Sequence, residues 1–159
     1  MTRKTILVVV VPALVLLHFT LHVGFGLGRV APDLLTLALL LAVRETGLGF
    51  GGGLGFLFGL MEDAFSVLAF GASTLAMTVV GILGARTRDL FVGDSLLFLF
   101  VYLTLGKLLR DLIYWVVAGE AMRGPFVDTV LIHGGLGGVY IAAVGFLLAS
   151  LFGGDRALR

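Results

Sequence analysis

Residues 51–63 read GGGLGFLFGLMED, a glycine-rich apolar run that ends in two adjacent acids, Glu62 and Asp63. An ionised carboxylate inside lipid is costly, so acids in such a setting usually face a protein interior and have a task. The apolar character extends along the whole chain. Of its 159 residues, 59% are hydrophobic and only 13% are charged, and mean hydropathy is +1.13. A soluble domain is about half apolar and a quarter charged.

Apolar runs separated by clusters of charge predict an all-α polytopic membrane protein with six transmembrane helices in one domain, residues 1–159. Most runs approach the roughly 20 residues that cross a bilayer. The exception is the second, whose apolar part is only Leu34 to Val43. It needs snorkelling flanks, a thin bilayer or a partly buried position. The predicted spans are 5–27, 32–44, 47–62, 71–85, 94–118 and 125–152.

The distribution of Lys and Arg predicts that both termini lie in the cytoplasm, because short cytoplasmic loops are rich in these residues. In that orientation the inner side holds Arg3, Lys4, Arg44, Arg86, Arg88, Arg156 and Arg159, and the outer side holds Arg29 and Arg123. The first apolar stretch is too long for a signal-peptide core and no small-x-small cleavage site follows it. We therefore expect it to be retained as a span.

Several functional classes have no support in the composition. The net charge of +1 and the lack of a basic tract give no sign of nucleic-acid binding. The chain has no cysteine, which excludes disulfides and thiolate metal sites. The connections between spans are too short for a nucleotide-binding fold. His18 and His22 are expected to be hydrogen-bonded packing residues, so no metal or cofactor is predicted.

Small residues recur at intervals of four on two predicted helices. One set is Gly47, Gly51, Gly55 and Gly59, and the other includes Gly134 and Gly138. Small residues at this spacing let helix backbones approach closely within a membrane. The pattern is open to two interpretations, packing inside the bundle or docking of a partner's transmembrane helix.

Polar residues gather at one depth when each predicted span is measured by the rise of about 1.5 Å per residue. They lie in the outer half of the membrane, as an outer-leaflet polar cluster or partner contact: Asp33, Glu62, Asp63, Lys107, Arg110, Asp111 and His133. Glu62 is expected to balance the surplus positive charge of the fifth span. Two simpler interpretations stay open: the acids only begin a loop, and Lys107 and Arg110 reach the outer headgroups by snorkelling.

Two segments resemble the MreD family of rod-shape-determining proteins. Pro32-Asp33 opens the second span, as a Pro-Asp does in that family, and residues 59–66, GLMEDAFS, match its Gly-x-x-x-Asp-x-x-Ser segment. Gly59 and Asp63 fall on the family's glycine and aspartate, and Asp111 resembles an aspartate of a late span. Glu62 departs from the pattern, since an apolar residue usually precedes that aspartate.

The resemblance implies a fold similar to the six-helix substrate-binding component of energy-coupling-factor transporters, without enzymatic activity. It implies a non-catalytic scaffold of the bacterial rod or elongation complex, multi-pass in the cytoplasmic (inner) membrane and surrounded by its lipids. The expected direct partner is MreC. MreB filaments, a SEDS-family glycosyltransferase and a class B penicillin-binding transpeptidase belong to the same complex, so the protein would contribute to peptidoglycan synthesis and cell shape.

Two other functions stay open at this point. An outward-facing polar cleft would suit a small-molecule-binding component of a transporter. Residues 71–73 and 133–135 faintly resemble the serine and histidine segments of rhomboid intramembrane proteases, although Thr74 stands where a glycine is expected. That resemblance would make Ser73 and His133 a catalytic pair.

Overall fold

The structure is a computed structural model that describes residues 5–26, 31–66, 69–87, 96–120 and 123–152. Within these residues the chain is helical and has no strand, which confirms the all-α prediction. Each predicted span contains one continuous helical segment. The segments are η1 Ile6–Val10 with α2 Val11–Phe19 and η2 Thr20–Gly24; α3 Leu34–Arg44; α4 Leu48–Asp63; α5 Ala72–Thr87; α6 Leu96–Val117; and η6 Val127–His133 with α7 Gly134–Phe152.

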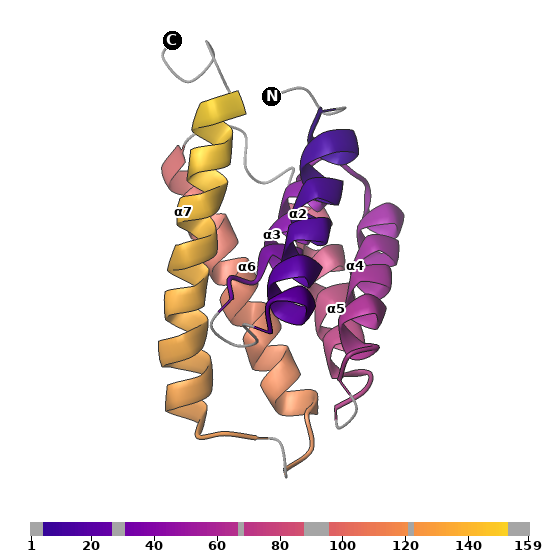
Figure 1. Cartoon of the computed structure of the whole chain (residues 1–159), viewed down its shortest axis with the longest axis vertical. Coiled ribbons are helices and arrows are strands. Elements are labelled where there is room, and N and C mark those ends of the chain that lie inside the picture. The colour runs from indigo at the N-terminus through magenta and orange to yellow at the C-terminus, as the bar shows by residue number, and fades with distance from the viewer. Residues whose placement is uncertain (1–4, 27–30, 67–68, 88–95, 121–122, 153–159) are drawn as a thin grey trace.

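Successive helices run up and down, so that the first helix begins and α7 ends at the same end of the molecule, the top of Figure 1. The turn from α4 to α5 and the connection from α6 to η6 lie at the other end. Two of the helices, Ile6–Gly24 and Val127–Ser150, are long and apolar enough to cross a membrane. The short helices α3 and α5 are also apolar.

Helix α3 is the centre of the fold. Every residue from Leu34 to Val43 is buried, and the helix packs against α2, α4, α5, α6 and α7. A helix that is apolar on all sides is stable only where neighbours cover it completely. This short apolar segment is therefore accommodated by burial, one of the three possibilities that its length leaves open.

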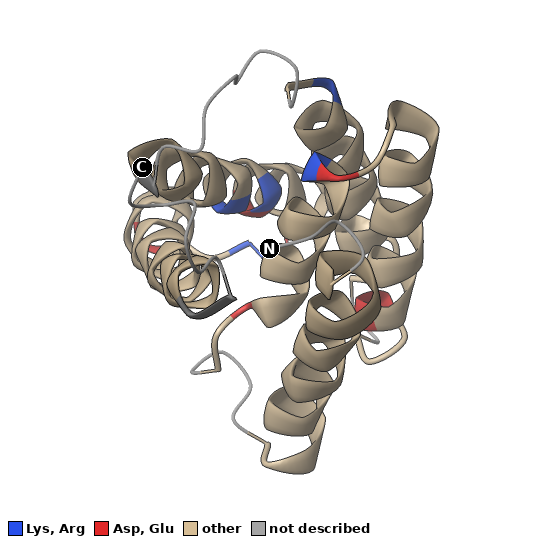
Figure 2. Ribbon diagram, turned by 90° about the horizontal axis from the view of Figure 1, so that it is seen from above, with Lys and Arg blue, Asp and Glu red and all other residues tan. Residues whose placement is uncertain are grey.

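The outer surface of the bundle is also apolar. Large hydrophobic side chains are exposed on every helical segment except the buried α3, for example Leu16 (71% exposed), Phe56 (49%) and Leu136 (67%). Charged residues are few along the helices, and most of the ribbon in Figure 2 is tan. In a protein surrounded by water, contiguous apolar surface of this kind marks a site of interaction. Within the described residues, exposed side chains of this kind occur on all the helices that surround α3.

Glycines bring α4 and α5 into backbone contact. A Cβ atom added at Gly51 would lie 2.7 Å from the Gly81 carbonyl oxygen, and one at Gly55 would overlap the backbone of Met77. One at Gly59 would overlap the backbone of Ser73 and Thr74. The glycines of this face therefore pack inside the bundle, against α5.

The other predicted packing glycines differ. Gly134 and Gly138 face α6, where an added Cβ would lie 3.0 Å from Asp111 and 3.1 Å from Thr104. The prediction that Gly47 belongs to the packing face is wrong. It precedes α4 in an extended conformation, and a Cβ there would meet no atom within 4 Å. The interval of four applies only inside a helix, and α4 begins one residue later.

Candidate functional site: a buried ionic cluster

Five charged side chains from three helices meet in what we call the ionic cluster: Asp33, Glu62, Lys107, Arg110 and Asp111. The first residue precedes α3, the second lies in the last turn of α4, and the other three share one face of α6. Lys107 and Arg110 are both only 8% exposed. Asp33 stands at the beginning of α3 and Glu62 at the end of α4. Both of these helix ends lie away from the two ends of the chain (Figure 1).

Lys107 joins α6 to the beginning of α3. Its Nζ atom lies 3.2 Å from Oδ2 of Asp33 and 2.5 and 2.7 Å from the carboxylate oxygens of Asp111. Asp33 also accepts hydrogen bonds from the backbone N–H of Thr36 (3.0 Å) and from its hydroxyl (2.7 Å). This is the bonding of a helix N-cap, which satisfies N–H groups that lack partners in the first turn.

Arg110 joins α6 to α4. Its guanidinium donates to Oε1 of Glu62 and to Oδ1 of Asp111 at 3.0 Å. Its Nε atom lies 4.0 Å from Asp33, and the group sits over the ring of Tyr114, 5.3 Å from the centroid. Glu62 of α4 therefore pairs with α6 through Arg110. Lys107 instead pairs with Asp33 at the beginning of α3 and with Asp111 of its own helix.

The cluster holds more acid than base: three carboxylates and two basic side chains give a formal charge of −1. Two buried polar atoms of the cluster have no hydrogen-bond partner within the described residues, Oε2 of Glu62 and Nε of Arg110. Buried charges are costly to desolvate, and pairing is what makes them tolerable. The acidic and basic side chains of the cluster therefore pair with one another, and only one negative charge is left in excess.

Asp63 belongs to a different site from Glu62. It is 1% exposed and accepts hydrogen bonds from the backbone N–H groups of Gly71 (2.9 Å), Ser73 (3.1 Å) and Thr74 (2.8 Å). The hydroxyl of Thr74 adds a fourth at 2.6 Å. Gly71 has φ +94°, a value that side chains disfavour. The last residue of α4 therefore caps the beginning of α5 and fixes the tight turn between them.

Replacing Asp63 with alanine should lower the free energy of unfolding by about 2–3 kcal/mol, because buried donors lose their acceptor. Asp63→Asn should cost less, since its amide oxygen can replace Oδ2, which accepts three of the four bonds. Unfolding of the detergent-solubilised protein by SDS, followed by circular dichroism, measures both. Asp128→Ala is the control, because that acid is exposed. Equal stability of Asp63→Ala and the control would contradict the capping role.

His18 was expected to be a hydrogen-bonded packing residue, and it lies where it supports α3. Its ring is 4% exposed, and Nδ1 accepts from the backbone N–H of Leu35 at 3.3 Å. The ring stacks on His22, whose Nδ1 lies 3.0 Å from the carbonyl oxygen of His18. His18 and Asp33 together satisfy two N–H groups of the first turn of α3. The contact spans 17 residues, so no local pattern predicts it.

His133 lies outside the ionic cluster. Its side chain is 69% exposed and stands 3.6 Å from the carboxylate of Asp128 on the same helix. Ser73 is 1% exposed, and its backbone N–H is bonded to Asp63. Among the described residues no hydrogen bond joins Ser73 to His133. Nor do these residues contain a group of three His, Cys, Asp or Glu side chains that could hold a metal ion.

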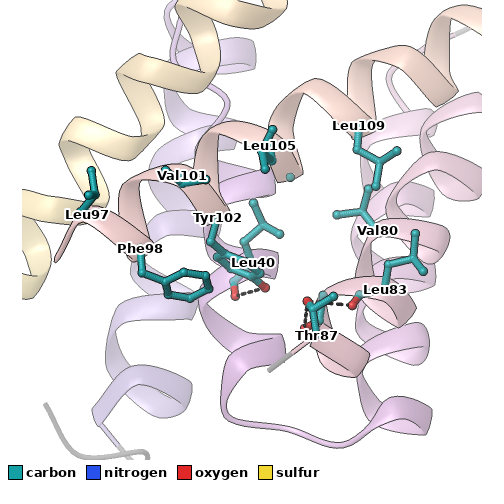
Figure 3. Close-up of a pocket in the computed structure, with 12 residues that line it drawn as sticks. Leu40, Val80, Leu83, Thr87, Leu97, Phe98, Val101, Tyr102, Leu105 and Leu109 are labelled. Atoms are coloured by element: carbon teal, nitrogen blue, oxygen red, sulfur yellow. Dashed lines mark hydrogen bonds between the residues drawn. The ribbon is translucent and has the colours of Figure 1, made fainter. Parts of the chain in front are cut away.

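A pocket of about 560 Å³ separates α5 from α6, with α3 at its base. Figure 3 shows Leu40 from α3, Val80 and Leu83 from α5, and Val101 and Leu105 from α6 around it. The sequence gives no sign of this pocket, because it depends on how far two helices diverge.

Comparison of the chain with protein-family models, curated proteins and solved structures finds no match.

Proposed function

We propose that the protein is a multi-pass protein of the bacterial cytoplasmic membrane and acts there as a non-catalytic scaffold of the MreD kind. The observation that carries this proposal is the distribution of polarity. The helices around α3 expose large hydrophobic side chains, while the charged side chains of three helices pair with one another inside. Such an arrangement suits lipid, where polar side chains turn toward the bundle interior and pair there.

The residues on which the family resemblance rests have structural roles that support it. Gly59 allows the backbones of α4 and α5 to touch, and Asp63 caps α5. Both act on the same helix pair, so a Gly-x-x-x-Asp segment would be retained for the geometry of that pair. Asp33 of the Pro32-Asp33 pair is the N-cap of the buried helix α3. These positions hold the scaffold together and leave its exterior for lipid and partner helices.

The orientation that the proposal requires can be tested with single cysteines, because the chain has none of its own. Gly47, just before α4, and Glu120, three residues after α6, are both exposed, and the beginning of α4 and the end of α6 lie at opposite ends of the bundle (Figure 1). In intact spheroplasts, a membrane-impermeant maleimide should label Glu120→Cys, whereas Gly47→Cys should react only after lysis. Labelling of both variants from outside would contradict a membrane-spanning bundle with its termini in the cytoplasm.

The scaffold function predicts that MreC from the same organism copurifies with the tagged protein in mild detergent. Cysteines carrying a photo-crosslinker at exposed positions of three helices, Phe56, Leu75 and Leu136, would then show which face MreC covers. We expect adducts on one face and none on the others. Charge reversal at Asp63 or Asp111 is unsuitable for this purpose, because both carboxylates hold internal contacts. Absence of MreC from a folded, monodisperse preparation would contradict the proposal.

A further inference from the structure

The pocket between α5 and α6 accepts hydrocarbon only. Two of its side chains carry a hydroxyl, Tyr102 and Thr87. Tyr102 donates to the carbonyl oxygen of Leu40 at 3.2 Å, and Thr87 to those of Leu83 and Gly84 at 3.0 and 3.2 Å. Figure 3 shows these hydroxyls turned to the backbone. The pocket wall therefore offers no free donor to a polar ligand, and a buried polar group would lose its hydrogen bonds there.

The volume of the pocket limits what can occupy it. About 560 Å³ lies inside the range of roughly 300–1,000 Å³ that is typical of sites for one small ligand. A transmembrane helix is about 10–12 Å across with its side chains and needs a continuous face. The pocket instead runs as a limited slot along α6, from Leu97 to Leu109. Its size favours one apolar chain over a partner helix.

Positive charge lies at one end of the pocket. The guanidinium of Arg44, one turn beyond Leu40 on α3, stands 6.0 Å from the ring centroid of Tyr102, which lines the pocket. Arg86 is exposed in the last turn of α5, next to the lining residue Thr87. This is the end at which the first helix begins and α7 ends, the cytoplasmic side in the proposed orientation (Figure 1). Basic side chains at that level attract anionic phospholipids.

We propose that this pocket binds one anionic phospholipid of the cytoplasmic leaflet, with an acyl chain between α5 and α6 and the phosphate at Arg44 and Arg86. The inference rests on the proposed membrane function and adds a ligand to it. Bound lipid would fill the space between two helices that the protein itself does not fill. It would thereby support the contact of α6 with α3 and α5.

Native mass spectrometry tests the proposal. The protein is exchanged into detergent that contains either phosphatidylglycerol or phosphatidylcholine, the two lipids having identical acyl chains. We expect one retained phospholipid per protein and a preference of about thirtyfold for phosphatidylglycerol, about fivefold from each of the two arginines near the headgroup. Arg44→Gln should keep the lipid but lower the preference to about fivefold. Equal retention of the two lipids by the wild type would overturn the assignment of the headgroup.

A matched pair of substitutions on α6 tests the acyl site. Val101→Trp should fill the pocket and lower lipid retention about tenfold or more. Val116→Trp places the same side chain at a similarly exposed position of the same helix (54% against 43%), outside the pocket, and should retain lipid as the wild type does. Equal retention in both variants would overturn the site. A protein that is soluble without detergent and carries no lipid would instead contradict the proposed membrane function.

Discussion

Replacing Arg110 with glutamine is expected to lower the free energy of unfolding by about 3–5 kcal/mol, the usual cost of breaking a buried ion pair. The reason is the charge of the ionic cluster. With both basic side chains present its formal charge is −1, and without Arg110 three carboxylates would share Lys107 alone, a charge of −2. Glu62 would also lose its partner from α6. SDS-induced unfolding of the detergent-solubilised protein measures the loss.

The matched variant is Glu62→Gln, which brings the cluster to neutrality and leaves an acceptor oxygen for the Arg110 guanidinium. We expect it to cost no more than about 1 kcal/mol, the net value of a typical hydrogen bond. The double variant restores the charge of −1 and should recover much of the stability that Arg110→Gln loses. If Glu62→Gln destabilises the protein as much as Arg110→Gln, the single pair dominates and the charge balance of the cluster does not.

Gly55→Leu should prevent α4 from packing on α5 and abolish the folded protein. A single Cβ at this position already overlaps the carbonyl and carbon atoms of Met77, and backbone atoms of a packed helix cannot move aside as a flexible side chain can. The loss should exceed about 4–5 kcal/mol, the range in which single substitutions are exceptional. The expected observation is aggregation of the variant in detergent, or its degradation in cells, under conditions in which the wild type stays folded.

Gly53→Leu is the control for this experiment. Gly53 is two residues away on the same helix, and a Cβ there meets no atom within 4 Å. Leucine is also a better helix former than glycine. We therefore expect the control to be at least as stable as the wild type. Equal damage from the two substitutions would mean that α4 tolerates no leucine at all, and the contact with α5 would not be the cause.

Much of the ionic cluster was predictable, because helices of uniform rise that alternate in direction bring remote residues to a common level. Counting along the spans placed Glu62, Lys107, Arg110 and Asp111 at similar depth, and the structure joins them. Depth says nothing about direction around the helix. Neighbouring residues point about 100° apart, which is why Asp63 turns to α5 while Glu62 turns to α6. His133 lies at a comparable depth, yet on the exposed side of its helix.

The central position of α3 shows a second limit of the sequence. An uninterrupted apolar run is compatible with a lipid-facing span and with complete burial, since both surroundings are apolar. Only the contacts with five other helices distinguish the two. The pocket between α5 and α6 was not predictable at all, because it depends on the divergence of two helix axes and on where Leu40 of a third helix falls.

The burial of α3 has a consequence for biogenesis. In the membrane setting proposed here, α3 leaves the ribosome long before α6. Its N-cap Asp33 nevertheless depends on Lys107 of α6 to neutralise its charge. Until α6 arrives, this carboxylate has no cation from that helix, and the apolar sides of α3 lack their later neighbours. Insertion and folding are therefore separate events in this chain, and the packing around α3 is completed only after α6 has been made.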